Sequence, residues 1–126
     1  MNSRDIQRLK RIVEIKAQLD DCIKNNNIGR EKILNDRDTR WMVSMPLLDI
    51  TEQVSSFSQG FAEKNKIPDF KSIRGMRNRL VHGYGDIDYD YIADAIFDDL
   101  PILVKRCEEL ICQVDSGDGD DVQDVF

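Results

Sequence analysis

The sequence is poor in the residues that build metal sites and disulfide frameworks. It has one histidine, His82, and three scattered cysteines with no CxxC pair (Cys22, Cys107 and Cys112). These residues do not make the ligand set of a zinc site, and an odd number of scattered cysteines is typical of a protein kept in a reducing compartment. We therefore expect a cytoplasmic protein that needs no metal and no cofactor.

Long hydrophobic runs and turn-forming residues are also scarce. No apolar stretch approaches the roughly 20 residues that span a bilayer, and the first residues, MNSRDIQRLKRIVEIKAQ, lack the apolar segment of a signal peptide. The 126 residues include only 7 Gly and 3 Pro, a composition typical of a helix-rich domain. We expect a single domain without a membrane partner.

The acidic charge is concentrated at the C-terminal end. Residues 115–126 (DSGDGDDVQDVF) contain five Asp and no basic residue, and removing these charges from the formal net charge of −6 leaves residues 1–114 at −1. The segment also lacks an apolar face. We therefore expect a helical bundle over 1–114 and an acidic, disordered tail over 115–126.

Apolar residues recur at spacings of three and four, which places them on single faces of helices. No stretch alternates with the period of two that a strand requires. We predict an all-α protein, an antiparallel up-and-down bundle of four to five helices. The apolar stripes are Ile6, Leu9, Ile12, Val13, Leu19 and Ile23; Val43, Leu47, Ile50, Val54, Phe57 and Phe61; and Ile92, Ile96, Leu100, Leu103, Cys107, Leu110 and Val114.

Local signals predict where these helices begin, end and bend. Gly29, in the break NNNIG, can take a positive φ, and Asp69 and the carboxylates of Asp86–Asp88 suit helix N-termini. The segment 30–65 reads as a short helix followed by a long one, with a kink at Pro46, and Pro101 should bend or split the last helix. We expect core positions for Trp41, Phe57 and Phe61, half-buried positions for Tyr89 and Tyr91, and apolar filling of the last helix and an interface by Cys107 and Cys112.

Positive charge gathers around the only histidine of this acidic chain. The stretch KSIRGMRNRLVHGYGD (residues 71–86) has no acidic residue before His82, and its basic residues are Lys71, Arg74, Arg77 and Arg79. Taken alone, a basic run is usually a solvated face, and a lone histidine near a helix C-terminus is usually structural because its charged form suits the helix dipole.

The spacing around His82 favours a chemical role. Asn78 lies four residues before His82, on the same helix face, whereas Arg77 reaches the same ligand only if the helix unwinds near Gly83 or the ligand is extended. Met76, Leu80 and Val81 would anchor the opposite, apolar side. Arginine binds phosphate oxygens through paired hydrogen bonds, and histidine exchanges protons near neutral pH. The set suits metal-free cleavage of RNA, whose 2′-hydroxyl is the nucleophile.

One histidine does not supply both the base and the acid that this cleavage uses. A two-fold dimer would bring a second His82 to the same cleft, so we expect a homodimer with the active site at its interface. The other basic residues, Lys71, Arg74 and Arg79, are expected to bind RNA phosphates.

The same block resembles a known family. Arg77-Asn78-x-x-x-His82-Gly83-Tyr84 within GMRNRLVHGY, the following DIDYDYI and the later DLP are similar to the HepT-like toxins of the HEPN superfamily, and the resemblance extends from about residue 38 to residue 111. It implies a helical, metal-independent ribonuclease that acts as a homodimer on RNA, with tRNA and mRNA as candidate substrates. It assigns catalysis to Arg77 and His82 and a supporting role to Asn78.

The resemblance also implies a partner. In such type VII-like toxin–antitoxin systems a nucleotidyltransferase antitoxin adds AMP to the motif tyrosine, here Tyr84, and so silences the toxin. A second interpretation stays open, in which the chain is a non-catalytic helical module that docks a nucleotidyltransferase or a nucleotide. A purely structural bundle would leave the polar cluster without a reason. The acidic tail is not part of the family pattern; it is either a solvated end or a segment that competes with RNA for the basic cluster.

Overall fold

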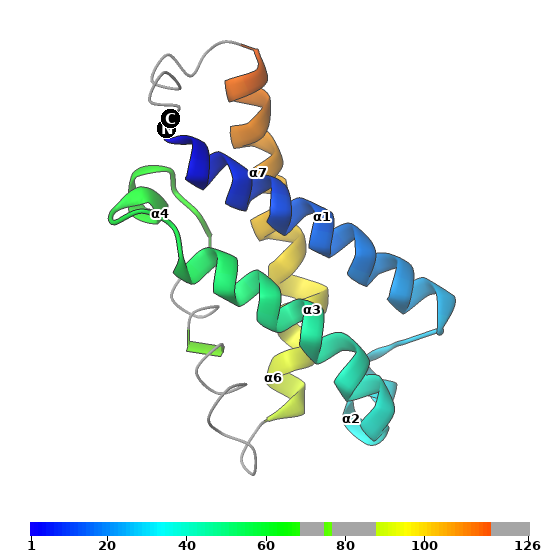
Figure 1. The fold of residues 1–126 in the computed structure, drawn as a ribbon. Helices are drawn as coiled ribbons and strands as arrows, with labels where there is room; N and C mark the ends of the chain where they lie inside the picture. The colour runs from blue at the N-terminus through cyan, green and yellow to red at the C-terminus, as the bar shows by residue number, and fades with distance from the viewer. Residues whose placement is uncertain (69–74, 77–87, 117–126) are drawn as a thin grey trace.

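The computed structural model describes residues 1–68, 75–76 and 88–116, and every regular element in these ranges is helical (Figure 1). The prediction of an all-α protein is therefore confirmed for the described residues, as is a short helix followed by a long one after residue 30. In chain order the elements are α1 (Ser3–Asn25), α2 (Arg30–Asn35), α3 (Arg37–Ser55), α4 (Phe61–Lys64), α6 (Tyr89–Asp94), the π-helical turn η1 (Ala95–Asp99) and α7 (Leu100–Asp115). None of them meets the length and hydropathy that a membrane-spanning helix requires.

The core forms where α1 packs against both α3 and α7 (Figure 1). The predicted stripes meet there, and their central members are almost completely buried: Leu9, Ile12, Leu19, Val43, Leu47, Ile50, Val54, Leu100, Leu103, Cys107 and Leu110. Burying one such side chain contributes about 1.5–3 kcal/mol. The stripe margins Val13, Ile23 and Val114 are only half-buried, and Ile15, which the α1 stripe omits, is buried.

Two helices end in the same way, with a residue other than glycine in the left-handed region. After α1, Asn27 has φ 51°, and Ile28 N–H donates to the Ile23 carbonyl at 2.9 Å. After α4, Lys66 has φ 54°, and Ile67 N–H donates to the Ala62 carbonyl at 2.9 Å. Both ends are Schellman motifs. The expectation that Gly29 would supply the positive φ of the first break is wrong, because Gly29 is extended (φ −116°) and precedes α2.

Replacing Lys66 by glycine is expected to raise the free energy of unfolding by about 0.5–1 kcal/mol. A residue with a side chain loses roughly 1–2 kcal/mol of stability in the left-handed region, and glycine removes this strain. Part of the gain is offset because glycine also raises the conformational entropy of the unfolded chain. Urea denaturation followed by circular dichroism measures the change. Lys66→Ala removes the charge and keeps the strain, so it should leave stability nearly unchanged; equal effects of the two substitutions would contradict the explanation.

The two prolines inside helical segments have different consequences. Pro46 lies inside α3, which continues through it to Ser55. Pro101 lies in the first turn of α7, directly after η1, where Leu100 N–H donates to the Ala95 carbonyl five residues earlier. A proline lacks an N–H and its ring crowds the preceding turn, and the wider π turn relieves that crowding. The chain stays helical from α6 through η1 into α7, so the helix is widened by a π turn at the place where a bend or a split was predicted.

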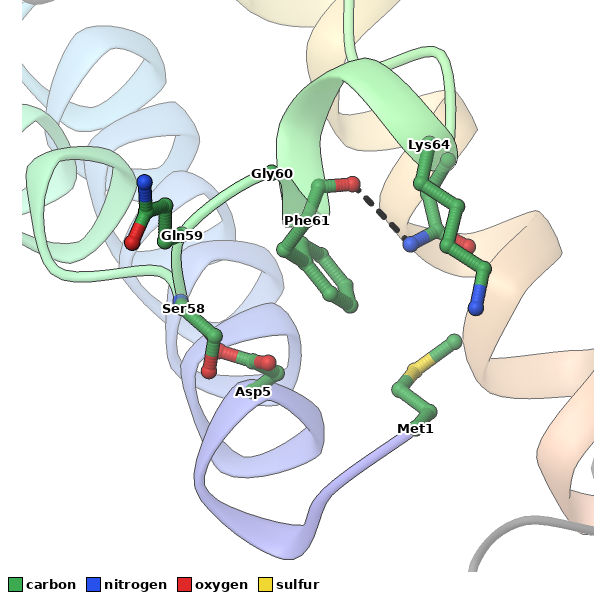
Figure 2. Close-up of a pocket in the computed structure, with 8 residues that line it drawn as sticks. Met1, Asp5, Ser58, Gln59, Gly60, Phe61 and Lys64 are labelled. Carbon is green, nitrogen blue, oxygen red and sulfur yellow. Dashed lines mark hydrogen bonds between the residues drawn. The ribbon is translucent and has the colours of Figure 1, made fainter.

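The predicted long helix up to residue 65 is interrupted after Ser55. Gly60 takes φ 78°, and Ser58 N–H donates to Oδ1 of Asp5 at 2.9 Å (Figure 2). Asp5 is only 2% exposed, although it belongs to the first turn of α1. A buried carboxylate requires hydrogen-bond donors, so this loop supplies one and gives up its helical conformation. The Phe57 and Phe61 rings stack across the interruption with centroids 4.7 Å apart.

Several aromatic and cysteine positions correct the sequence expectations. Trp41 was expected in the core but is 66% exposed, because α3 turns this face away from α1 and α7. Cys112 is exposed, whereas Cys107 is buried, and burial raises the pKa of its thiol to about 12. Phe61 is buried, and Tyr89 and Tyr91 are half-buried, as expected, whereas Phe57 is only half-buried against the core in which it was expected.

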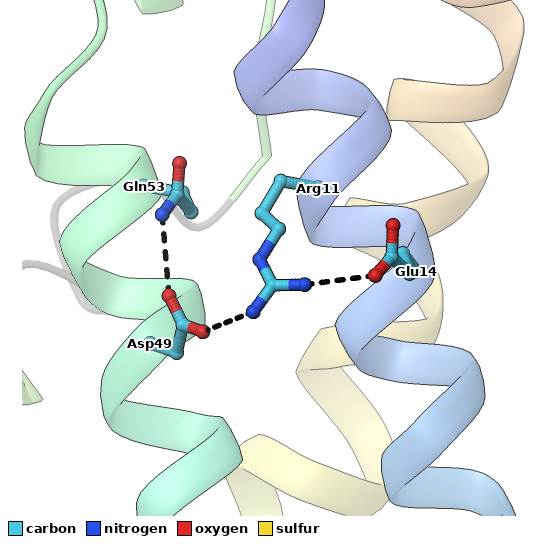
Figure 3. Close-up of polar contacts among 4 residues, drawn as sticks. All are labelled: Arg11, Glu14, Asp49 and Gln53. Carbon is cyan, nitrogen blue, oxygen red and sulfur yellow. Dashed lines mark hydrogen bonds and ion pairs between the residues drawn. The ribbon is translucent and has the colours of Figure 1, made fainter.

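A polar network joins α1 to α3 on the outside of the core (Figure 3). Arg11 donates to Glu14 at 2.8 Å and to Asp49 at 3.0 Å, and Gln53 donates to the other oxygen of Asp49 at 3.2 Å. Ion pairs this exposed contribute roughly 1 kcal/mol or less. Their role here is geometric, because they hold the Asp49 side chain in one position.

Candidate functional site

The residues predicted to carry the chemistry lie outside the described part of the chain. This holds for the catalytic set, for the tyrosine and for the phosphate-binding residues: Arg77, Asn78 and His82; Tyr84; Lys71, Arg74 and Arg79. The predicted cap Asp69 also lies outside it. Their roles therefore stay predictions, and the structure describes the residues that border them.

Three described points hold the stretch that contains the motif. Ile67, just before it, is 7% exposed, and Asp88, just after it, caps α6. Between them Gly75 and Met76 are helical, and Met76 is 2% exposed. The expectation of an apolar anchor is thus confirmed for Met76, whereas Leu80 and Val81 lie outside the described residues. Met76, the residue before the motif, is therefore attached to the core.

The chain enters this stretch from the end of α4, which α7 helps to hold. Arg106 of α7 donates from Nε to the carbonyl of Asn65 at 2.9 Å, and this carbonyl belongs to the C-cap of α4. A basic side chain that binds the last carbonyls of a helix also suits the negative end of the helix dipole. Arg106 therefore ties the end of α4, where the chain enters the stretch, to α7.

The chain leaves the stretch at Asp88, whose carboxylate accepts from Asp90 N–H at 3.0 Å. The next residue, Tyr89, lies under the guanidinium of Arg40, 4.0 Å from the ring centroid. Arg40 also donates to the carbonyls of Ile33, at 2.8 Å, and Leu34. One arginine of α3 thus joins the end of α2 to the start of α6, immediately after the motif stretch.

Sequence reasoning missed the role of Arg40. It is one of many arginines in a charge-rich chain, and neither its spacing nor its neighbours in the sequence point to Tyr89. Cation–π contacts contribute about 0.5–2 kcal/mol, more when the pair is withdrawn from water. The contact of Arg40 with Tyr89 can be recognised only in the tertiary structure, because α2 and α6 lie next to each other only after the chain has folded.

The start of α3 is fixed by its own cap. Asp36 accepts hydrogen bonds from the backbone N–H of Thr39 at 3.0 Å and from the Thr39 hydroxyl at 2.5 Å. These bonds favour the ionised carboxylate and hold the pKa of Asp36 below its usual range. In residues 1–68, 75–76 and 88–116, no three His, Cys, Asp or Glu side chains gather as metal ligands.

Comparison with known proteins identifies the family. Residues 3–110 match the family model described as HepT-like, "Ribonuclease HepT-like". The archaeal protein "Putative RNase MJ1216" of Methanocaldococcus jannaschii is 28% identical over 119 residues, 94% of this chain and 97% of that protein. "Putative RNase MJ0127" of the same organism is 26% identical over 117 residues, 86% of this chain and 97% of that protein.

A bacterial relative matches a shorter part. "Putative RNase TTE0752" of Caldanaerobacter subterraneus subsp. tengcongensis is 34% identical over 62 residues, 49% of this chain and 55% of that protein. No solved structure matches the chain significantly. Since the family match spans nearly all of the described helices and the motif stretch between them, the chain belongs to the HepT-like ribonuclease family.

Proposed function

We propose that this protein is a metal-independent endoribonuclease that cleaves RNA through the 2′-hydroxyl and acts as a homodimer. The observation that carries the proposal is that the family match, residues 3–110, includes the block with Arg77, Asn78 and His82. The names of the relatives, each called an RNase, support the same class of activity.

The residues have distinct roles in the proposed reaction. His82 of one subunit takes the proton of the 2′-hydroxyl, and His82 of the other gives a proton to the leaving 5′-oxygen. Arg77 stabilises the negative charge that develops on the phosphoryl oxygens, and Asn78 orients the pair. The phosphates on either side of the scissile bond bind Lys71, Arg74 and Arg79.

Regulation follows from the tyrosine two residues after His82. A nucleotidyltransferase antitoxin would add AMP to Tyr84, and the bulky, negatively charged nucleotide would exclude RNA and repel its phosphates. In this proposal the chain is the toxin of a type VII-like toxin–antitoxin pair in the cytoplasm. Residues 1–114 form the catalytic domain, and 115–126 form a separate acidic tail.

Cleavage of RNA in the absence of divalent metal is the direct test. The unmodified dimer should cleave tRNA or mRNA at the same rate with and without excess EDTA, because the 2′-hydroxyl and the two histidines replace the metal. Denaturing gels of end-labelled RNA measure the rate, and the products should carry 2′,3′-cyclic phosphate ends. A rate that falls to background in EDTA and returns with magnesium would contradict the metal-free mechanism.

The alternative, a non-catalytic module that docks a nucleotidyltransferase, predicts a different result. Unmodified protein would then bind the partner and leave RNA intact with or without metal. The motif favours the enzyme, since docking does not need a histidine beside Arg77 and Asn78.

A further inference from the structure

Exposed hydrophobic side chains are concentrated on one face of α3. Four large hydrophobic side chains are strongly exposed in the described ranges, and three of them lie on adjacent turns of α3: Trp41 at 66%, Met42 at 40% and Met45 at 69%. The fourth, Ile102, stands alone on α7 at 54%. We call Trp41, Met42 and Met45 the α3 patch. Clustered exposed apolar side chains of this kind mark interaction surfaces, and tryptophan and methionine are enriched in them.

A groove of about 480 Å³ opens beside the patch, between α1 and α3. Its lining is Ile15, Gln18, Met45, Pro46, Leu48, Asp49 and Glu52. Asp49, on its wall, is held by Arg11 at 3.0 Å and by Gln53 at 3.2 Å (Figure 3). The groove is therefore preformed, with one wall fixed by the contacts that join the two helices.

We propose that the α3 patch and this groove are the contact surface for a second copy of the chain, related by a two-fold axis near Met45. Trp41 precedes Met45 by four residues, about 6 Å along the helix, and the groove residues Leu48–Glu52 follow it by three to seven. In an antiparallel pair of α3 helices centred at Met45, Trp41 of each copy faces the groove of the other. A two-fold interface requires this self-complementarity.

The charges along α3 favour the same arrangement. Arg37 lies eight residues before Met45, and its guanidinium is 5.3 Å from the centroid of the Trp41 ring. Glu52 lies seven residues after Met45 and lines the groove. The two-fold axis therefore brings Arg37 of one copy towards Glu52 of the other. The carboxylates of Asp49 and Glu52 in the groove disfavour an RNA backbone, which carries the same sign of charge.

The location of the patch connects it with the proposed activity, on which this step of the inference rests. Arg40, the residue before Trp41, contacts Tyr89, two residues after the undescribed stretch 77–87 ends. The α3 patch thus begins next to the point where the motif stretch rejoins the bundle. A dimer joined by α3 would supply the second His82 that the proposed reaction uses.

Oligomeric state measured by sedimentation velocity over a range of protein concentrations tests the surface without RNA or activity. Met45→Glu should weaken dimerisation at least about 30-fold, because it places two charges against each other at the axis, the scale of a central interface residue. The matched control Ile102→Glu changes another exposed hydrophobic residue, on α7, and should leave the dimer unchanged. Circular dichroism verifies that both variants are folded.

The pairing geometry is tested by crosslinking in a Cys22→Ser, Cys112→Ser background. A short bis-maleimide should join two copies through Met45→Cys but not through Ile102→Cys. A monomeric wild type, a dimer unaffected by Met45→Glu, or equal crosslinking at both positions would overturn the proposal. So would a Trp41→Ala variant that stays dimeric and loses RNA binding, since the patch would then be an RNA surface. A dimer that behaves as expected but never cleaves RNA would refute the proposed function alone.

Discussion

His82→Ala should lower the rate of RNA cleavage by at least about 100-fold. General acid–base catalysis by a positioned side chain contributes roughly 100- to 10,000-fold, and the substitution removes both the base and the acid when two copies share one cleft. Single-turnover cleavage of end-labelled RNA in EDTA measures the loss. In cells, expression of the variant without its partner should no longer arrest growth.

The controls for this experiment separate chemistry from folding. His82→Ala should keep the circular dichroism spectrum and the sedimentation coefficient of the wild type, because α1, α3 and α7 build the described core from their own apolar side chains. A dimer with one wild-type and one His82→Ala subunit should also be inactive if each cleft uses both histidines. Cleavage at the wild-type rate by the uniform variant would refute the catalytic assignment.

Tyr84→Phe should abolish modification by the nucleotidyltransferase and leave cleavage active. Only the phenolic oxygen accepts the AMP group, and phenylalanine keeps the aromatic ring. Intact mass after incubation with the partner and ATP should show one or more AMP groups on the wild type and none on the variant. The variant should therefore stay active in the presence of the antitoxin, whereas the wild type is silenced.

Two neighbouring tyrosines provide matched controls. Tyr89→Phe and Tyr91→Phe should both still be modified at Tyr84, since these residues belong to α6, and Tyr89 is half-buried under Arg40. A Tyr84→Phe protein that still gains AMP would transfer the assignment to one of them. If the wild type gains no AMP in the same experiment, the protein is regulated in another way.

The apolar stripes could be predicted because burial in a bundle follows helical periodicity. Leu9, Ile12 and Leu19 of the first stripe, the second stripe from Val43 to Val54 and the third from Ile92 to Leu110 are buried as their spacing required. Asp88 and Pro101 were also predictable, since a cap acts on its own turn and a proline on the turn before it. The motif around His82 was recognisable for a different reason, namely that its residue types and order match a family.

Other features could not be predicted because they depend on neighbours that are distant in the sequence. Asp5 reads as an ordinary first-turn acid, yet it is buried and binds Ser58 N–H, 53 residues away. Arg40 reads as a surface charge, yet it contacts Tyr89 and two carbonyls of α2. Trp41 was expected in the core, and only the packing of α3 decides that its side chain faces outward.

The sequence by itself determined that the chain is helical, where the apolar stripes that supply most of its core lie, and that it carries the HepT-like block around Arg77, His82 and Tyr84. These properties follow from local periodicity and from residue identity, which require no knowledge of the other helices. Only the tertiary structure decided that α3 ends at Ser55, that Arg40 secures the exit of the motif stretch, and that Trp41 and Met45 form an exposed patch beside a groove. The physical reason is that the hydrophobic stripe of a helix specifies which face is buried, whereas its other faces acquire a role only from the elements that pack beside them.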